Sequence, residues 1–327
     1  MIEDLKYTAV IRTLGKAGNK YLQLLESLNN QLIKPVKIIV YIAEGYTIPL
    51  ETINIETYIY VKKGMVAQRA LSYDEVSTEY ILFLDDDVYL PRYAVSKMYE
   101  YLLNYNANVI SPDVFPNAER SFFYKCMMFF SGRMLPRKDD GKWGYKVMRN
   151  SGYSYNNNPN LDIYLSQTNA GPCFFCKKED FLRIHFEEEL WMDSLNYAQG
   201  DDQVMFYKMY LKGLKQLTWF HSGVKHLDAK STMENKDKKK MLLYSDFRFK
   251  IIFWHRFIYL PDQSSLSRLY SILSISYICF FTLFTSLLKC DLNILNLKFQ
   301  AIKDGLAFIK SQEYCNIPLI VRSISIK

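Results

Sequence analysis

The chain has 327 residues, of which 49% are hydrophobic and 23% are charged. This balance excludes a wholly disordered protein, and the length suits one large α/β domain with an extension, or two modest domains. The formal net charge of +7 favours a phosphate-rich ligand or an anionic membrane surface as a partner. Because no nucleic-acid-binding motif accompanies the charge, we do not expect nucleic acid as a partner.

Both the N-terminus and the cysteines are typical of a cytosolic chain. The opening residues Met1-Ile2-Glu3-Asp4 lack the basic and apolar regions of a signal peptide, so the N-terminal part is expected to stay in the cytosol. Cys173 and Cys176 form a single C-x-x-C, without the second pair that a zinc site would need. They lie in an apolar run that predicts a buried strand, on which the two thiols would point to opposite faces as structural residues.

The first third of the chain alternates between strand and helix patterns. Such alternation predicts an α/β fold with a mainly parallel sheet flanked by helices, in which ligands bind beyond the C-terminal ends of the strands. Apolar or β-branched runs predict strands at residues 7–11, 36–42, 57–61, 80–84 and 109–111. Helical spacing predicts one helix through Leu24, Leu25, Leu28 and Leu32, one through Ala67, Ala70 and Leu71, and one at residues 93–103.

The middle of the chain is less regular. Periodicity fades between about residues 112 and 168, and long irregular segments in compact domains are typically functional loops or lids. We expect this segment to contact an acceptor molecule, with Trp143 as one candidate residue and Trp191 as another, although each could equally serve in packing. Strand and helix patterns return at residues 171–176 and 202–211.

The composition changes after residue 228. Residues 236–240 read as a basic connector, and residues 269–288 form a stretch without a formal charge. That stretch could span a bilayer, lie in the interface as a helix or hairpin, or form a helix buried against the main domain. We therefore divide the chain into a main domain of residues 1–235 and a basic, aromatic and apolar helical region of residues 236–327, which is expected to associate with a membrane.

Three consecutive carboxylates, Asp85, Asp86 and Asp87, follow the apolar run of residues 80–84. Three like charges at the end of a buried strand are costly unless a cation neutralises them. Oxygen ligands favour Mg²⁺ or Mn²⁺, and such an ion would hold a diphosphate and offset the charge on a leaving group. A solvated acidic turn is the structural alternative.

A second acidic pair, Asp201 and Asp202, opens the helical pattern of residues 202–211. Carboxylates at a helix N-terminus commonly serve as caps, but this pair could also supply a general base that deprotonates an acceptor hydroxyl. His226 follows both acidic sites and is a candidate metal ligand. Its competitor is His221, and a structural hydrogen bond is the other possibility.

These motifs, in this order, resemble the family 2 glycosyltransferases with the GT-A fold. The resemblance rests on Gly64-x-x-x-x-Arg69, on the three aspartates that follow residues 80–84, and on Gly200-Asp201-Asp202. Near the C-terminus, Asp304-Gly305-Leu306 is similar to the tail of membrane-associated bacterial members. The resemblance covers residues 5–230 well and the remainder loosely.

The resemblance implies a nucleotide-binding role for several positions. Thr13 and Glu44 match positions that hold the nucleobase, and Arg69 matches the helix arginine that supports the nucleotide site. Asp85 would contact the ribose or the metal shell, and Asp86 occupies the variable middle position of the D-x-D motif.

The same resemblance implies the metal site and the reaction. Asp87, with Asp85 and the late histidine His226, would hold Mn²⁺ or Mg²⁺ as the cofactor. Asp202 matches the general base, with Asp201 in the adjoining acidic position. The implied activity is an inverting glycosyl transfer by direct displacement.

The chain departs from the family pattern at two positions. Arg12 follows Ile11 where many members have a proline, and Glu44 stands where aspartate is commoner, so the choice of nucleotide stays open. The implied partners are a nucleotide-diphosphate sugar donor and a glycan or lipid-linked acceptor at the cytoplasmic face of the cell membrane, as in bacterial surface polysaccharide synthesis. Two alternatives remain: a phosphohydrolase that uses Asp85-x-Asp87, and a catalytically silent nucleotide-sugar-binding membrane scaffold.

Overall fold

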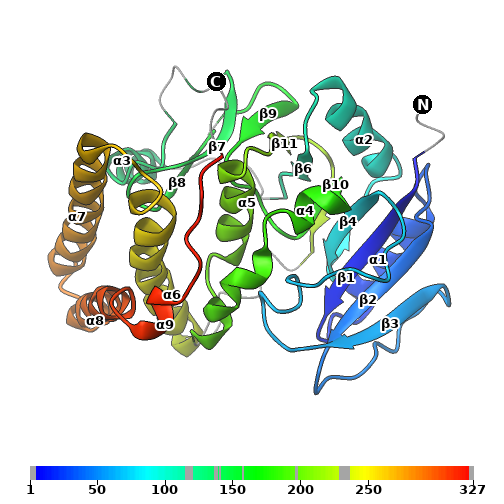
Figure 1. The fold of residues 1–327 in the computed structure, drawn as a ribbon, viewed down its shortest axis with the longest axis horizontal. Coiled ribbons are helices and arrows are strands. Elements are labelled where there is room, and N and C mark those ends of the chain that lie inside the picture. The colour runs from blue at the N-terminus through cyan, green and yellow to red at the C-terminus, as the bar shows by residue number, and fades with distance from the viewer. Residues whose placement is uncertain are drawn as a thin grey trace.

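Figure 1 shows the chain as a computed structural model, with the strands β1 to β3 at one end of the molecule and the helix α7 at the other. The structure describes residues 5–114, 121–135, 139, 141–156, 158–195, 198–227 and 236–323. Parts of the expected acceptor loop of residues 112–168, and residues 228–235 before the expected boundary, lie outside the described residues. The side chain of Lys236 lies outside them as well.

Four parallel strands form the N-terminal part of the main sheet: β1 (Tyr7–Thr13), β2 (Lys37–Ala43), β3 (Glu56–Val61) and β4 (Tyr80–Asp85). Their order in the sheet is β3-β2-β1-β4. These strands confirm four of the predicted ones. The order brings the C-terminal end of β1 beside the acidic end of β4, because the two strands pair in parallel.

Six further strands extend the sheet in the order β10-β6-β11-β9-β7-β8. β10 runs antiparallel to both β4 and β6, whereas β6 pairs in parallel with β11, and β7 with β9. The predicted α/β fold with a mostly parallel sheet is confirmed. The six strands are β6 (Val109–Pro112), β7 (Trp143–Val147), β8 (Tyr153–Tyr155), β9 (Ile163–Ser166), β10 (Cys173–Lys177) and β11 (Gln216–Trp219).

Helices cover both faces of the sheet. One hydrophobic cluster joins α1 (Asn19–Asn29) and α2 (Ala94–Asn104) to one face. The other face packs against α4 (Lys178–Leu182), the 3₁₀ helix η1 (Phe186–Ser194) and α5 (Asp201–Leu211). Cys173 belongs to the first cluster and Cys176 to the second, so the predicted buried thiols on opposite faces are confirmed.

Two helix predictions need correction. α1 ends at Asn29, and Leu32 lies beyond it with an exposed side chain, because its backbone N–H bonds to Arg92 O instead of continuing the helix. The helix expected through Ala67, Ala70 and Leu71 is a series of turns at residues 64–70. The N–H groups of two residues there bind the Asp193 carboxylate, and Tyr73 has a φ of 55°, in the left-handed region that a right-handed helix excludes. Tertiary contacts therefore replace a continued helical ladder.

The segment of residues 112–168 is also more regular than predicted. It contains α3 (Phe122–Phe130) and the short strands β7, β8 and β9. Most residues of α3 are themselves aromatic or methionine, on all sides of the helix. The segment therefore lacks the alternation of polar and apolar faces that would predict a helix. The strands have three to five residues each, which is too short for a clear alternating pattern.

The C-terminal region is helical, as predicted. Residues 236–240 are not a connector but the first turn of α6 (Lys236–Phe253), which continues into a π-helical turn, η3 (Trp254–Tyr259). α7 (Ser265–Leu288), α8 (Leu292–Phe308) and α9 (Gln312–Cys315) follow. Side chains of α6 and η3 belong to the same hydrophobic cluster as α5 and the sheet.

α7 is the one helix among the described residues that is long and apolar enough to cross a membrane. Its most apolar window has a mean hydropathy of 1.9, and only 22% of that window is buried. Figure 1 shows it at the outer edge of the molecule. The low burial disfavours the reading of this segment as a helix buried against the main domain.

Candidate active site

The C-terminal ends of β1 and β4 meet at a cleft of about 650 Å³. Arg12 is the register partner of Asp85 across these parallel strands, and Thr13 follows it. The next residues after β4, Asp86 and Asp87, line the same cleft. The sheet thereby gathers the three predicted carboxylates at one edge, as the rule for parallel sheets requires.

Asp85 is held by two arginines. Arg12 binds both of its oxygens: Nε contacts Oδ1, and Nη2 donates to Oδ2 at 3.1 Å. Arg69 Nη2 lies 3.7 Å from Asp85 Oδ1. Burial alone would raise the pKa of Asp85, but the charges of Arg12 and Arg69 outweigh it and lower the pKa below its ordinary value.

Arg69 connects this carboxylate to the second acidic pair. Its side chain is buried, and Nη1 donates to Asp201 Oδ2 at 2.9 Å and also contacts Asp202 Oδ1. Nη2 donates to Gly171 O at 3.0 Å. A single guanidinium therefore joins the end of β4, the N-terminus of α5 and the chain that precedes β10.

Gly171 is required for this arrangement by its close approach to the acidic pair. Its N–H donates to Asp202 Oδ2 at 3.0 Å. A Cβ atom at this position would lie 1.9 Å from Asp202 Oδ1 and 2.6 Å from Arg69 Nη2. Any side chain here would displace both partners.

The two carboxylates of the pair have different environments. Asp201 is buried, and this burial, followed by the charge of Asp202, raises the pKa of Asp201 to about 7. The side chain of Asp202 is 34% exposed. Asp202 is therefore the member of the pair that can meet a ligand, whereas Asp201 lies behind it against Arg69.

Asp87 and His226 face each other at the edge of the cleft. The short strands β5 (Val88–Tyr89) and β12 (Lys225–His226) pair antiparallel and bring them together. His226 Nε2 lies 3.0 Å from Asp87 Oδ1, and Leu227 N donates to Asp87 O at 2.8 Å. The competitor His221 lies elsewhere, with Nδ1 3.6 Å from Asp162 Oδ1 at an exposed position.

The two positions matched to the nucleobase differ in placement. Thr13 is buried at the cleft, accepts a hydrogen bond from Gly15 N at 2.8 Å and donates to Asp86. Burial is the main cause that raises the pKa of Asp86 to about 6, although the Thr13 hydroxyl opposes it. Glu44 follows β2 as an exposed side chain and does not line the cleft.

Several residues of the cleft were missed by the sequence analysis as site residues. Asp193 accepts hydrogen bonds from Val66 N at 3.1 Å and Ala67 N at 2.8 Å, which fixes the turn that carries Arg69. Gln68 lines the cleft and donates to Thr13 O at 3.1 Å. Arg12 was visible only as a departure from the family pattern.

Two lysines give the cleft a positive rim. Lys16 and Lys63 both line it, and their ammonium groups lie 4.9 Å and 5.0 Å from the ring centre of Tyr46. Cations on an aromatic ring beside a polar cleft suit an anionic ligand. Nothing in the spacing of these residues along the sequence indicated that they would converge.

The two tryptophans considered for acceptor contacts have different surroundings. Trp191 is buried, donates from Nε1 to Glu189 Oε2 at 2.8 Å and packs on Phe308, which supports its packing role. Trp143 is half-buried in β7, with Lys142 and Lys146 near its ring.

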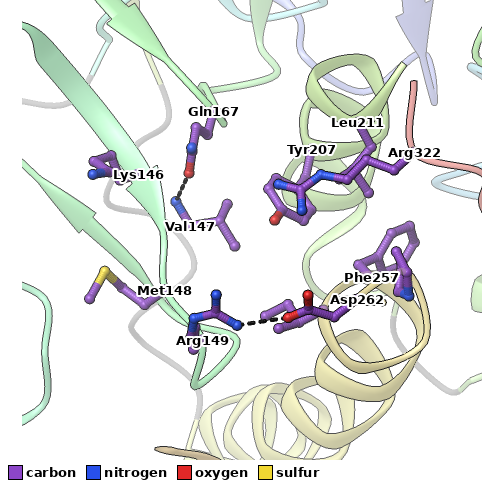
Figure 2. A pocket seen from close by; sticks show the side chains of 12 residues that line it. Lys146, Val147, Met148, Arg149, Gln167, Tyr207, Leu211, Phe257, Asp262 and Arg322 are labelled. Atoms are coloured by element: carbon purple, nitrogen blue, oxygen red, sulfur yellow. Dashed lines mark hydrogen bonds and ion pairs between the residues drawn. The ribbon is translucent and has the colours of Figure 1, made fainter. Parts of the chain in front are cut away.

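A second, smaller pocket lies between α5, the turn after β7 and the chain that follows η3. Figure 2 shows Tyr207 and Leu211 of α5 on one side and Lys146 and Arg149 on the other. Two of its lining residues form an ion pair, Arg149 Nη1 with Asp262 Oδ2 at 2.9 Å. This pair ties the β7–β8 turn to the C-terminal region.

Structural comparison places the chain among GT-A proteins. GalNAc-T7, solved with UDP, GalNAc and Mn²⁺, has a TM-score of 0.51 at 12% identity, and the match covers 84% of this chain and 54% of that one. TarS of S. aureus has a TM-score of 0.46 at 12% identity, covering 84% of this chain and 43% of that one. The chain thus spans about half the length of these proteins.

Sequence comparison identifies the family. No protein with curated annotation matches the chain. Residues 18–181 match the sequence model of Glycosyl transferase family 2, a segment that runs from α1 through the acidic end of β4 to α4. Because this match spans half of the chain and the fold is GT-A, the protein belongs to glycosyl transferase family 2.

Proposed function

We propose that the protein transfers a sugar from a nucleotide-diphosphate sugar to an acceptor hydroxyl, with inversion and with a divalent cation, Mn²⁺ or Mg²⁺. One observation carries this proposal: the arginine network that connects the acidic cleft to Asp202. Arg69 contacts Asp85 on the donor side and the partly exposed Asp202 at the N-terminus of α5, so one side chain holds both carboxylates in place. A phosphohydrolase that uses Asp85-x-Asp87 would need Asp85 free to react, whereas Arg12 occupies both of its oxygens.

Asp87 and His226 suit a divalent cation. A carboxylate oxygen and an imidazole nitrogen 3.0 Å apart are a donor set that Mn²⁺ accepts. Within the described ranges no three His, Cys, Asp or Glu side chains form a metal-binding group, so the donor diphosphate would supply further oxygen ligands. The Mn²⁺ and UDP present with GalNAc-T7 support this assignment. A bound cation would offset the charge of the departing diphosphate.

In this proposal the remaining residues divide into nucleotide contacts and a base. Asp202 accepts the proton of the acceptor hydroxyl, while the Arg69 guanidinium and the Gly171 N–H fix the orientation of its carboxylate. Arg12 orients Asp85 for contact with the ribose. Thr13 and the lysine rim contact the nucleotide.

We further propose that residues 236–327 attach the domain of residues 1–235 to the cytoplasmic face of the cell membrane. The exposed, apolar surface of α7 and the lysines at the start of α6 support this attachment. A lipid-linked glycan is the acceptor that suits an enzyme held at a membrane, as in the synthesis of a bacterial surface polysaccharide.

The test is transfer and hydrolysis of UDP-, GDP- and TDP-sugars by the purified full chain with Mn²⁺, Mg²⁺ or EDTA. We expect metal-dependent turnover that Asp87→Ala abolishes. We expect Asp202→Asn to lower kcat by at least about a hundredfold, which is the usual contribution of a general base. Asp74→Asn is the matched control, because Asp74 is exposed, accepts a hydrogen bond from the nearby Ser72 hydroxyl and does not line the cleft.

The outcomes separate the alternatives. Metal-dependent nucleotide binding without turnover, even with lipid-linked acceptors added, would support the silent scaffold instead. Full activity of Asp202→Asn would remove Asp202 from the mechanism. For the attachment, the expected result is that the protein sediments with membranes at high salt and is released by detergent, and a monodisperse protein in detergent-free buffer would contradict it.

A further inference from the structure

Two helices far apart in the sequence expose a shared apolar surface. α3 is nine residues long, yet all four of its phenylalanines are exposed, with Phe122 at 83%. Soluble monomers rarely expose contiguous apolar patches larger than a few hundred Å². We call this the α3–α7 surface; it comprises Phe122, Phe123, Phe129 and Phe130 of α3 and Leu269, Tyr270, Leu273, Tyr277 and Phe280 of α7.

The two helices are in direct contact. Tyr277 OH donates to Phe130 O at 3.0 Å, and the rings of Phe130 and Phe281 lie 6.4 Å apart. Figure 1 shows α3 beside α7 at the same outer edge of the molecule. α3 therefore extends the membrane-facing region beyond residues 236–327, to a segment inside the family 2 domain.

A pocket of about 310 Å³ lies among α3, α6, α7 and α8, beside this surface. Its lining includes the apolar side chains of Met127, Ile278 and Phe281. It also includes the two lysines Lys250 and Lys298. The pocket thus combines apolar side chains of α3 and α7 with lysines of α6 and α8.

The two lysines converge on one aromatic ring. The ammonium groups of Lys250 and Lys298 lie 4.6 Å and 5.1 Å from the ring centre of Phe247. Lys298 Nζ donates to Ser286 Oγ at 2.8 Å, and Lys250 contacts Asp246. With Arg133, three cations but one carboxylate line the pocket, which leaves an excess of positive charge.

Lys298 is half-buried and has other cations nearby. Burial, followed by the charges of Lys289 and Lys250, lowers the pKa of Lys298 below its ordinary value. An anion between the two ammonium groups would relieve this repulsion. A phospholipid suits both the pocket and the α3–α7 surface. Its phosphate would meet the lysines, and its acyl chains would lie on the apolar surface.

We propose that this pocket binds the headgroup phosphate of an anionic membrane phospholipid, whose acyl chains lie along the α3–α7 surface. The site rests on the membrane attachment proposed above but not on the catalytic roles. It determines which lipids hold the enzyme and in which orientation. A hydrogen bond connects the pocket to the proposed base. Gln203, which follows Asp202, donates from Nε2 to Ser151 O at 3.0 Å, and Gly152, which follows Ser151, lines the pocket.

The test is binding of the full chain to phosphatidylcholine vesicles with and without phosphatidylglycerol. We expect tighter binding to the anionic vesicles, and a loss of about fivefold in affinity for each of Lys250→Gln and Lys298→Gln. Lys303→Gln is the matched control: it makes the same charge change on α8, at an exposed position outside the pocket. Phe122→Ser with Phe123→Ser should weaken binding to both kinds of vesicle.

Three results would overturn the site: equal binding to both kinds of vesicle, a loss with Lys303→Gln as large as with Lys298→Gln, or release by inorganic phosphate at constant ionic strength. The last would identify a site for a free anion. Hydrolysis of the nucleotide-sugar, measured without vesicles, checks that each variant is folded. The same assay separates the two proposals. If the wild-type protein is inactive but still prefers anionic vesicles, the catalytic proposal fails and the lipid site stands.

Discussion

Replacing Arg256 with methionine tests whether a buried ion cluster joins the C-terminal helices to η1 and α5. Glu189 of η1 is fully buried, and Arg256 of η3 binds both of its oxygens, with Nε–Oε2 at 2.9 Å and Nη2–Oε1 at 2.7 Å. Lys208 of α5 donates to Glu189 Oε1 at 2.9 Å. Arg256 Nη1 also donates to Pro318 O at 2.9 Å, in the C-terminal tail.

The expected loss follows from what remains after the substitution. Removing one partner of a buried ion pair typically costs about 3–5 kcal/mol. Glu189 would keep Lys208 and the Trp191 N–H, so we expect the lower end, about 3 kcal/mol. Methionine fills most of the volume of the arginine stem, which keeps the cost of a cavity small. In a chain of 327 residues, with an unfolding entropy of about 2.1 cal/mol/K per residue, that corresponds to a fall in Tm of roughly 4 °C.

The assay is denaturant unfolding in detergent, followed by tryptophan fluorescence. Arg149→Met is the control, because the Arg149–Asp262 pair is partly exposed and should contribute at most about 1 kcal/mol. Losses of equal size in the two variants, or less than about 1 kcal/mol for Arg256→Met, would refute the reasoning.

The pH dependence gives a second readout of the same cluster. Burial would raise the pKa of Glu189, but the Arg256 hydrogen bonds and the Lys208 charge outweigh it and lower the pKa. This stabilisation is therefore fully present above the ordinary carboxyl pKa of 4.5 and is lost as the pH falls through the lower folded-state value. Wild type should lose stability more steeply than Arg256→Met in that acidic range.

Two further predictions concern tightly packed positions. Gly171→Ala should reduce turnover at least about tenfold, because the new methyl group would collide with the Asp202 carboxylate; unchanged kcat would show that the loop can move aside. Cys173 and Cys176 are fully buried, and burial raises the pKa of both thiols, so a thiol-specific reagent should label the exposed Cys290 and Cys315 first. Rapid labelling of the buried pair, read by mass spectrometry of peptides, would contradict this packing.

The elements that the sequence predicted well are those with strong local patterns. The runs at β1, β2 and β4 carry continuous apolar residues, as strands buried on both faces must, and the acidic triplet marks the end of β4. The sequence did not predict α3 or the strands β7 to β9. Their apolar residues show no helical or alternating period, and contacts with residues distant in the sequence determine these elements. The antiparallel direction of β10 likewise depends on its partners.

The candidate site was predictable where chemistry is concentrated in a short motif. The aspartates after β4 and at the start of α5 could be found from the sequence, and the structure brings them into one network with Arg69. The role of Arg12 could not, since its partner Asp85 lies 73 positions away. Glu44 stood in the expected place along the chain, but its side chain is exposed and does not reach the cleft.

The central position of β10 determines when the protein can fold during synthesis. β4 pairs with β1 on one edge and with β10 on the other, so its second edge stays unpaired until β10 has left the ribosome. An unpaired strand edge can associate with other chains. The delay continues, because Ser323 N still donates to Leu211 O at 2.9 Å in α5. The chain near residue 323 therefore adds to the contacts of α5 long after β4 is made, so the nascent chain should depend on chaperones over this interval.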